Sequence, residues 1–267
     1  MKVYAGCAWR SLEKIRSVQP LIHNITNYVV MNNTANALLS LGASPVMAHA
    51  SEEVADMVKM AAALVINIGT LSREWVNSMA QAMATARGRG VPVVFDPVGA
   101  GATPYRKSTA LNLIHVAPPT IIRGNASEII ALAKEDVQTR GVDSLASSYH
   151  ALETAERLCR DLGTVICISG EVDFIVHAGG ILRVLNGHSL MPKVTGLGCT
   201  ASALCGAFAA VEEDPSLAAA CAMSVMGVAG EIAGQDCKGP GSFQVRFLDA
   251  LYNLTAKDLE RIRLEVA

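Results

Sequence analysis

Short apolar runs alternate with helical patterns along the middle of the chain. Six of these runs are rich in Val and Ile, as buried strands usually are, and they span Leu64–Ile68, Val91–Phe95, Thr120–Ile122, Val165–Ile168, Phe174–Val176 and Ile181–Val184. The first four are separated by connections long enough for a helix, which predicts βαβ units and a parallel sheet. The last two lie close together and predict a hairpin at an antiparallel edge of that sheet.

Residues at helical spacing fill the connections and most of the final third of the chain. Apolar side chains recur at intervals of three and four residues over 75–86 and again over 201–211. The Asp-Pro pair at 214 and 215 is typical of a helix start. The helix that follows is apolar almost all round to about residue 234, which predicts that it is buried. We therefore expect one doubly wound α/β domain over residues 1–267.

The composition narrows the class of protein. Hydrophobic residues make up 51% of the chain and charged residues only 17%, against roughly 25% in an average domain. No Asp, Glu, Lys or Arg occurs over Ser17–Ser51, but asparagines scattered through that stretch argue against a membrane span. The first residues lack the apolar core of a signal peptide, so we expect a cytoplasmic protein. A net charge of −2 argues against a nucleic-acid-binding surface.

The cysteines indicate neither a disulfide framework nor a zinc site. There are seven of them, an odd number, without a Cys-x-x-Cys pair or zinc-ligand spacing. Cys199 differs from the others because it follows Gly-Leu-Gly at a predicted helix start. The helix dipole at that position favours a thiolate.

Polar and glycine-rich segments follow the predicted strands, at the edge where ligands gather in such sheets. The segments are Asn67–Thr70, Phe95–Gly101, Arg123–Glu128 and Ser169–Glu171, with Thr195–Cys199 opening the later helix. In the last of these, two glycines free backbone N–H groups to converge on an anion, although a tight turn before a packed helix is the alternative. The Walker pattern is absent and the dinucleotide fingerprint is poorly matched.

Two carboxylates at neighbouring strand ends suggest a magnesium site for phosphates. Asp96 directly follows an apolar run, and Glu128 lies three residues after Asn125. A turn cap before Pro97 is the alternative for Asp96, and a capping box with Asn125 is the alternative for Glu128. Arg123 follows an apolar strand and could pair with phosphates through its planar fork.

Taken in order, these segments resemble the hydroxyethylthiazole kinase family, which belongs to the ribokinase-like kinases. The resemblance covers the chain from Pro20 to about Phe247. It rests on the segments PLIHNITNYVVMNNTANALLSLGASPVMAHA, VINIGTL, VVFDPVGAG, IIRGNASEI, ISGEVDFI, KVTGLGCTASAL and KGPGSF. It implies a three-layer αβα sandwich with a mostly parallel central sheet. It also implies transfer of the γ-phosphoryl group of ATP to the hydroxyl of hydroxyethylthiazole, giving the thiazole phosphate of thiamine biosynthesis.

The resemblance also implies a role for individual residues. Asn27, Met47 and Gly196 would contact the thiazole, with Met47 reaching from a neighbouring subunit of a homotrimer. Arg123 and Ser169 would bind ATP, and Asp96 and Glu128 would organise Mg²⁺. The turn of Gly196, Leu197, Gly198 and Cys199 would form the anion hole. Cys199 would assist catalysis at the position where wider relatives carry aspartate.

Other activities remain open on the same scaffold. A kinase for hydroxymethylpyrimidine or pyridoxal is one alternative, and a hydro-lyase that repairs hydrated nicotinamide cofactor is another. Cys199 in place of aspartate argues against both of these. A catalytically silent nucleotide-binding protein is a third, disfavoured by Asp96, Arg123 and Glu128 occurring together with the glycine turn.

Overall fold

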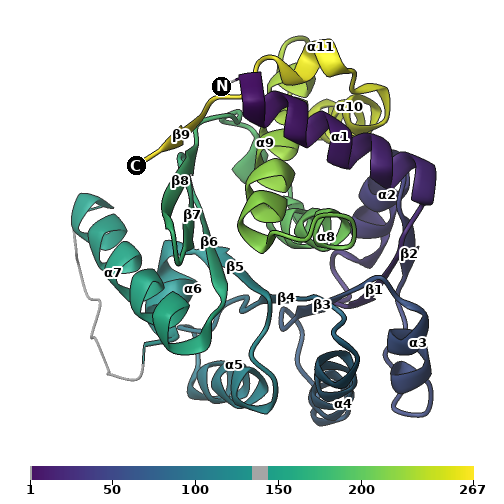
Figure 1. Ribbon diagram of the computed structural model, residues 1–267, viewed down its shortest axis with the longest axis vertical. Helices are drawn as coiled ribbons and strands as arrows, with labels where there is room; N and C mark the ends of the chain where they lie inside the picture. The colour runs from purple at the N-terminus through teal and green to yellow at the C-terminus, as the bar shows by residue number, and fades with distance from the viewer. Residues whose placement is uncertain (1, 134–143) are drawn as a thin grey trace.

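A twisted sheet of nine strands forms the centre of the computed structural model, which describes residues 2–133 and 144–267 (Figure 1). The strand order is β2-β1-β3-β4-β5-β6-β7-β8-β9. Neighbouring strands are parallel from β2 to β6 and antiparallel from β6 to β9. The strands are β1 (Leu21–Ile25), β2 (Ser44–Val46), β3 (Ala63–Asn67), β4 (Val93–Asp96), β5 (Ile121–Asn125), β6 (Val165–Ser169), β7 (Asp173–His177), β8 (Gly180–Val184) and β9 (Leu264–Val266).

Helices cover both faces of the sheet, which confirms the three-layer αβα sandwich (Figure 1). One face carries α1 (Lys2–Val18), α2 (Met31–Leu41), α8 (Leu197–Ala209), α9 (Pro215–Gly234), α10 (Pro240–Asn253) and α11 (Ala256–Leu259). The other carries α3 (Val54–Met60), α4 (Arg73–Arg89), α5 (Pro104–Val116), α6 (Ala126–Ala131) and α7 (Ser144–Leu162). A short 3₁₀ turn at Met191–Lys193 precedes α8.

Small residues let α8 approach the sheet closely. Its buried face is built largely from alanine, serine, cysteine and glycine. A Cβ on Gly206 would lie 2.6 Å from Cγ2 of Val65 in β3, so only glycine permits this spacing. The close approach brings the first turn of α8 next to the ends of the parallel strands.

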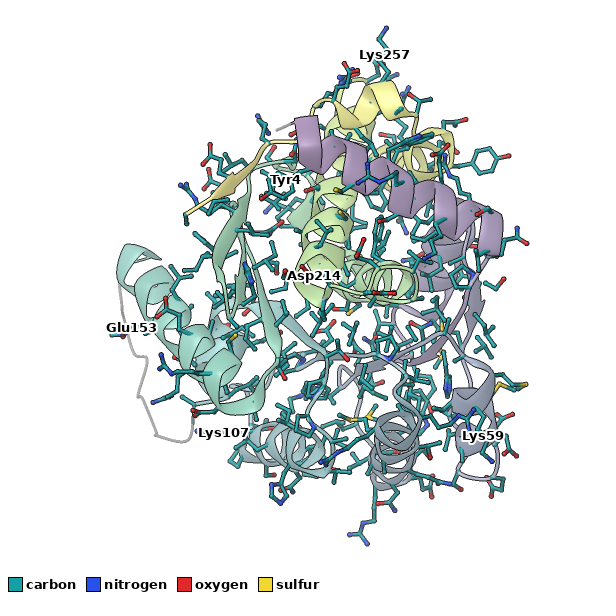
Figure 2. The ribbon with its side chains drawn as sticks, in the orientation of Figure 1. Tyr4, Lys59, Lys107, Glu153, Asp214 and Lys257 are labelled. Carbon is teal, nitrogen blue, oxygen red and sulfur yellow. The ribbon has the colours of Figure 1, made fainter. Side chains whose placement is uncertain are left out.

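The apolar helix α9 lies inside the fold. It is long and apolar enough to span a membrane, but 78% of its most apolar stretch is buried within the protein. The prediction of a buried helix over 214–234 is therefore confirmed, with Asp214 as its N-cap. Charged side chains such as Lys59, Glu153 and Lys257 lie instead at the periphery (Figure 2).

The six predicted strands are all present, and the parallel and antiparallel pairings agree with prediction. The predicted hairpin is not the edge of the sheet, because β9 pairs with β8 outside it. Two further parallel strands, β1 and β2, lie within the uncharged Ser17–Ser51 stretch, where no strand was predicted. Buried His23 and Asn24 interrupt the apolar run of β1 and hide it from a search for apolar strands.

Candidate active site

Polar side chains from five parallel strands meet at one edge of the sheet. Asn67, Asp96 and Ser169 are the last residues of β3, β4 and β6, Arg123 lies in β5, and Asn27 follows β1. Because the carboxyl ends of parallel strands share an edge, residues far apart in the sequence become neighbours. The strand-end segments singled out from the sequence are thus brought together.

Asp96 is at the centre of this group and is fully buried. Its Oδ2 atom accepts hydrogen bonds from Asn67 Nδ2 at 2.8 Å and from Ser202 Oγ at 2.7 Å. Arg123 Nη1 lies 3.9 Å from the same oxygen. The other carboxylate oxygen, Oδ1, is buried without a hydrogen-bond partner. A buried carboxylate oxygen of this kind is suited to an added cation or a proton.

The surroundings of Asp96 hinder its ionisation. Burial raises the pKa of its carboxyl to about 7, opposed by Arg123 and reinforced by the negative charge of Glu128. Burial is the largest single influence on the pKa of Arg123 and lowers it, but the combined charges of its neighbours, Asp96 foremost, raise the pKa overall. Asp96 therefore titrates near neutral pH while Arg123 stays charged.

Arg123 joins Asp96 to the start of α8. Its Nη2 donates to Ser169 Oγ, and its Nε has no partner. A Cβ on Gly198 would lie 3.1 Å from Nη1, so glycine at this position makes room for the guanidinium. The two predicted nucleotide-binding residues, Arg123 and Ser169, are thus in direct contact.

The first turn of α8 has backbone donors that no side chain caps. Its N-cap, Gly196, has a left-handed backbone with φ of 89°, and no side chain caps the helix. A Cβ at Gly196 would also lie 2.8 Å from Cγ1 of Val30, a second reason for glycine. The geometry suits an anion near Gly196 to Cys199.

Cys199 is not a resting thiolate, contrary to the expectation from the helix dipole. Burial and then the charge of Asp96 raise the pKa of its thiol to about 11. Hydrogen bonds from neighbouring asparagines lower the pKa only in part, and one of them runs from Asn27 Nδ2 to Sγ at 3.5 Å. Desolvation outweighs the half-charge of a helix end.

Glu128 forms the capping box that the sequence left open. Its backbone N–H donates to Asn125 Oδ1 at 2.9 Å, and the Asn125 N–H donates to Glu128 Oε2 at 2.8 Å. The N–H of Gly99 donates to Oε1 at 2.9 Å. Each carboxylate oxygen keeps a further lone pair, so the capping role leaves room for a metal-bound water.

Asp96 and Glu128 fit a magnesium ion bound with phosphates. The unpartnered Oδ1 of Asp96 offers a ligand atom, and the effect of Glu128 on the pKa of Asp96 is one that a cation would relieve. Among residues 2–133 and 144–267, no three His, Cys, Asp or Glu side chains gather as a metal cluster. Mg²⁺ commonly uses only one or two carboxylates, with waters and phosphates completing its octahedron.

Asn27 and Met47, two of the predicted thiazole residues, lie on the side of Asp96 opposite to Arg123, because β1 and β2 are on one side of β4 in the sheet and β5 is on the other. Asn27 follows β1, and Met47 directly follows β2, the edge strand beside it. Gly196 is a neighbour of Val30, three residues beyond Asn27. Met47 is half-buried, and neither it nor Asn27 lines the large cavity described next.

A cavity of about 800 Å³ opens on the Arg123 side. Ser169, Gly198 and Asp173 line it together with the loop from Leu185 to Pro192 and the methionines of α9. A second cavity of about 590 Å³ lies at the amino ends of β4 and β5, away from these side chains. The first has the volume of a small-molecule site and contains the predicted nucleotide-binding residues.

Two residues of the network were not identified from the sequence. Asn67 bridges Asp96 and Asn27, and Ser202 contacts Asp96 from α8. Asn67 could have been found, because it lies near the end of the predicted strand Leu64–Ile68 and opens the polar segment Asn67–Thr70. Ser202 lies three residues beyond Cys199, and this helical spacing was its only signal.

Comparisons with known proteins identify the family of this chain. The sequence profile described as the hydroxyethylthiazole kinase family matches residues 12–257. The chain belongs to the hydroxyethylthiazole kinase family. A hydroxyethylthiazole kinase from Syntrophus aciditrophicus is 59% identical over 262 residues, covering 98% of this chain and 97% of that one.

Solved structures place this member of the hydroxyethylthiazole kinase family among proteins of the same fold. The hydroxyethylthiazole kinase from Pyrococcus horikoshii matches with a TM-score of 0.90 at 40% identity, covering 97% of this chain and 98% of that one. The pyridoxal kinase from Staphylococcus aureus, in complex with AMP-PCP and pyridoxal, matches with a TM-score of 0.64 at 14% identity. It covers 93% of this chain and 98% of its own, and this likeness concerns the fold alone.

Proposed function

We propose that this protein transfers the γ-phosphoryl group of ATP to the hydroxyl of hydroxyethylthiazole, yielding the thiazole phosphate used in thiamine biosynthesis. One observation carries the proposal. The chain belongs to the hydroxyethylthiazole kinase family, and its buried Asp96 has two different kinds of neighbour. The uncharged side chains of Asn27 and Cys199 contact each other on one side, and the positive charge of Arg123 lies on the other, next to the uncapped N-terminus of α8. A neutral alcohol and a polyphosphate require these two environments.

The alcohol would bind on the neutral side. Asn27 and Gly196 would contact the thiazole of their own subunit, and Met47 would reach it from a neighbouring one. A small neutral heterocycle needs apolar walls and a few oriented hydrogen bonds. Asn27 supplies such a group, and Met47 a flexible apolar wall.

The nucleotide would occupy the cavity beside Arg123. The guanidinium of Arg123 and the hydroxyl of Ser169 would hold its phosphates. Asp96 and Glu128 would hold Mg²⁺, which when bound neutralises charge on the β- and γ-phosphates. The part of the cavity lined by Met223 and Met226 is apolar and would receive the base.

The residues act mainly by positioning and charge neutralisation, because phosphoryl transfer passes through a loose transition state. Backbone N–H groups from Gly196 to Cys199 would face the charge that develops on the transferred group. Cys199 would act as a neutral thiol that orients the attacking hydroxyl, since its raised pKa leaves it protonated at neutral pH. It therefore assists the reaction without being indispensable.

The assembly would be a homotrimer of single-domain chains in the cytoplasm, with active sites between subunits. Three side chains of the uncharged stretch support this, because Tyr28, Val29 and Leu39 are each more than half exposed in the isolated chain. Sedimentation velocity at micromolar concentration is expected to give a trimer. A monomer would contradict this part of the proposal.

A coupled assay of ADP release tests the proposed activity. Hydroxyethylthiazole, hydroxymethylpyrimidine and pyridoxal are supplied in parallel with Mg²⁺ and ATP. We expect the highest kcat/KM with hydroxyethylthiazole, and mass spectrometry should identify its phosphate. A clear preference for either other alcohol would overturn the substrate assignment, and no turnover with any of them would overturn the kinase proposal.

A further inference from the structure

Asn67 connects the carboxylate of Asp96 to the carboxamide of Asn27. It ends β3 and is only 1% exposed. Its Nδ2 donates to Asp96 Oδ2 at 2.8 Å, while its Oδ1 accepts from Asn27 Nδ2 at 2.8 Å and from the backbone N–H of Gly69 at 2.9 Å. Both ends of this amide are thus used by specific partners.

The orientation of Asn67 follows from its neighbours. A backbone N–H can only donate, so the atom of Asn67 that faces Gly69 must be the oxygen. Its nitrogen then faces Asp96, whose Oδ2 accepts the hydrogen bond. The same oxygen requires a donor from Asn27, so the Nδ2 of Asn27 must point toward Asn67.

This arrangement determines what Asn27 can offer to a ligand. One Nδ2 hydrogen is directed to Asn67 and the other to Cys199 Sγ at 3.5 Å. The oxygen accepts from the backbone N–H of Val29 at 3.1 Å and keeps one lone pair. The free capacity of Asn27 is therefore that of an acceptor. The only hydrogen-bond donor of hydroxyethylthiazole is its hydroxyl group.

We propose that Asn67 is a positioning residue, which holds Asn27 so that its oxygen accepts from the hydroxyl of the alcohol that is phosphorylated. The inference rests on the proposed function and on Asn27 as a substrate contact. Gly69 supports it from the opposite side, because a Cβ there would lie 2.4 Å from Asn27 Nδ2. The backbone at Gly69 and the amide of Asn67 together confine the Asn27 side chain.

Steady-state kinetics of Asn67→Ala test the proposal. Misplacing a reacting group by about 1 Å costs on the order of 10²-fold in rate, so kcat/KM for hydroxyethylthiazole should fall by that order. The KM for ATP should change no more than it does in Ser202→Ala, because Asn67 does not line the nucleotide cavity and both residues donate to the same oxygen of Asp96. A purely structural role would instead impair the kinetic constants for the alcohol and for ATP together, and that result would overturn the proposal.

Ser202→Ala is the matched control, because Ser202 also donates to Asp96 but does not contact Asn27. In a double-mutant cycle, Asn67→Ala combined with Asn27→Ala should be about tenfold more active than independent effects predict. Ser202→Ala combined with Asn27→Ala should show independent effects. Equal coupling in both cycles would overturn the proposal, since Asn67 would then act through Asp96 alone.

Gly69→Ala keeps the inference testable if Asn67→Ala fails to fold. Its added methyl group displaces Asn27 without removing a hydrogen bond to Asp96, and should reproduce the selective loss toward the alcohol. An unchanged kcat/KM in folded Gly69→Ala would overturn the inference about Asn67 but would not affect the proposed function. A parent protein that phosphorylates none of the three alcohols would overturn the proposed function, and the inference with it.

Discussion

Replacing Asp96 by asparagine should stabilise the protein while impairing the kinase reaction. The substitution keeps the shape of the side chain and an oxygen for the donors Asn67 and Ser202. It removes a negative charge that the fully buried site holds with difficulty. Stability and activity are therefore expected to change in opposite directions, a behaviour typical of functional sites.

The magnitude follows from the pKa of Asp96, which burial raises from 3.8 to about 7. Each pKa unit corresponds to about 1.4 kcal/mol, so the ionised carboxylate costs the folded state about 4 kcal/mol. Between pH 4 and 7 the folded state binds more protons than the unfolded state, so stability falls as pH rises through this window. Above pH 7 the full cost is present, and below pH 4 it is absent.

Urea unfolding of Asp96→Asn and the parent protein, from pH 4 to pH 8 with EDTA present, measures this difference. We expect equal unfolding free energies near pH 4 and an advantage for the variant that grows to about 4 kcal/mol by pH 8. Adding Mg²⁺ and ATP should narrow the gap, because they stabilise only the parent. Plots of unfolding free energy against pH that run parallel for the two proteins, or a variant less stable than the parent at pH 8, would refute the conclusion that burial disfavours the ionised form of Asp96.

Three further predictions concern the rest of the site. Cys199→Ala should lower kcat without abolishing turnover, and unmeasurable turnover in both Cys199→Ala and Cys199→Asp, with ATP binding intact, would contradict an assisting role. Glu128→Gln keeps one side-chain oxygen but turns an amide nitrogen toward one of the two backbone N–H groups, of Asn125 and Gly99, that donate to the carboxylate. Magnesium titrations should show a raised Mg²⁺ requirement, because the negative charge is lost, together with a modestly lower melting temperature. An unchanged titration would refute the metal role. Gly227→Ala should raise the KM for ATP, because its Cβ would lie 2.6 Å from Cβ of Asn186 in the cavity-lining loop. Gly88→Ala is the control, because its Cβ would meet nothing within 4 Å. Equal KM values for ATP in the two glycine variants would contradict a role of the cavity-lining loop in binding ATP.

The parallel core of the sheet could be predicted because its strands are short, apolar and separated by helices. Strand β1 could not, since its His23 and Asn24 are polar residues that interrupt the apolar pattern although both are buried, and the partner of His23 comes from tertiary structure. His23 contacts the backbone oxygen of Ala48 through Nε2 at 2.7 Å, a contact across 25 positions of sequence. The local pattern of hydrophobic residues carries no information about hydrogen bonds between residues that are far apart in the sequence.

The site shows the same division between local and long-range information. Glu128 and Asn125 form a capping box at three-residue spacing, which the sequence already offered as one alternative. The protonation state of Cys199 could not be predicted from the spacing of residues in the sequence. It depends on burial and on Asp96, a residue 103 positions earlier that only the fold brings near. Sequence spacing alone indicated the helix dipole, which is the weaker of the competing effects.

The electrostatics of Asp96 explain how a charge-poor chain can hold a phosphate-transfer site. Without ligands, the carboxylate is buried, one oxygen is unpartnered and Arg123 compensates its charge only in part. Mg²⁺ and the phosphates of ATP would add one positive and one negative partner, at Asp96 and Arg123 respectively. A bound Mg²⁺ would then favour the ionised form of Asp96, and the phosphates would pair with the charge of Arg123. The hydrogen bonds that run from Asp96 through Asn67 and Asn27 to Cys199 involve only neutral partners beyond Asp96, so they bring no further charge to the proposed alcohol side.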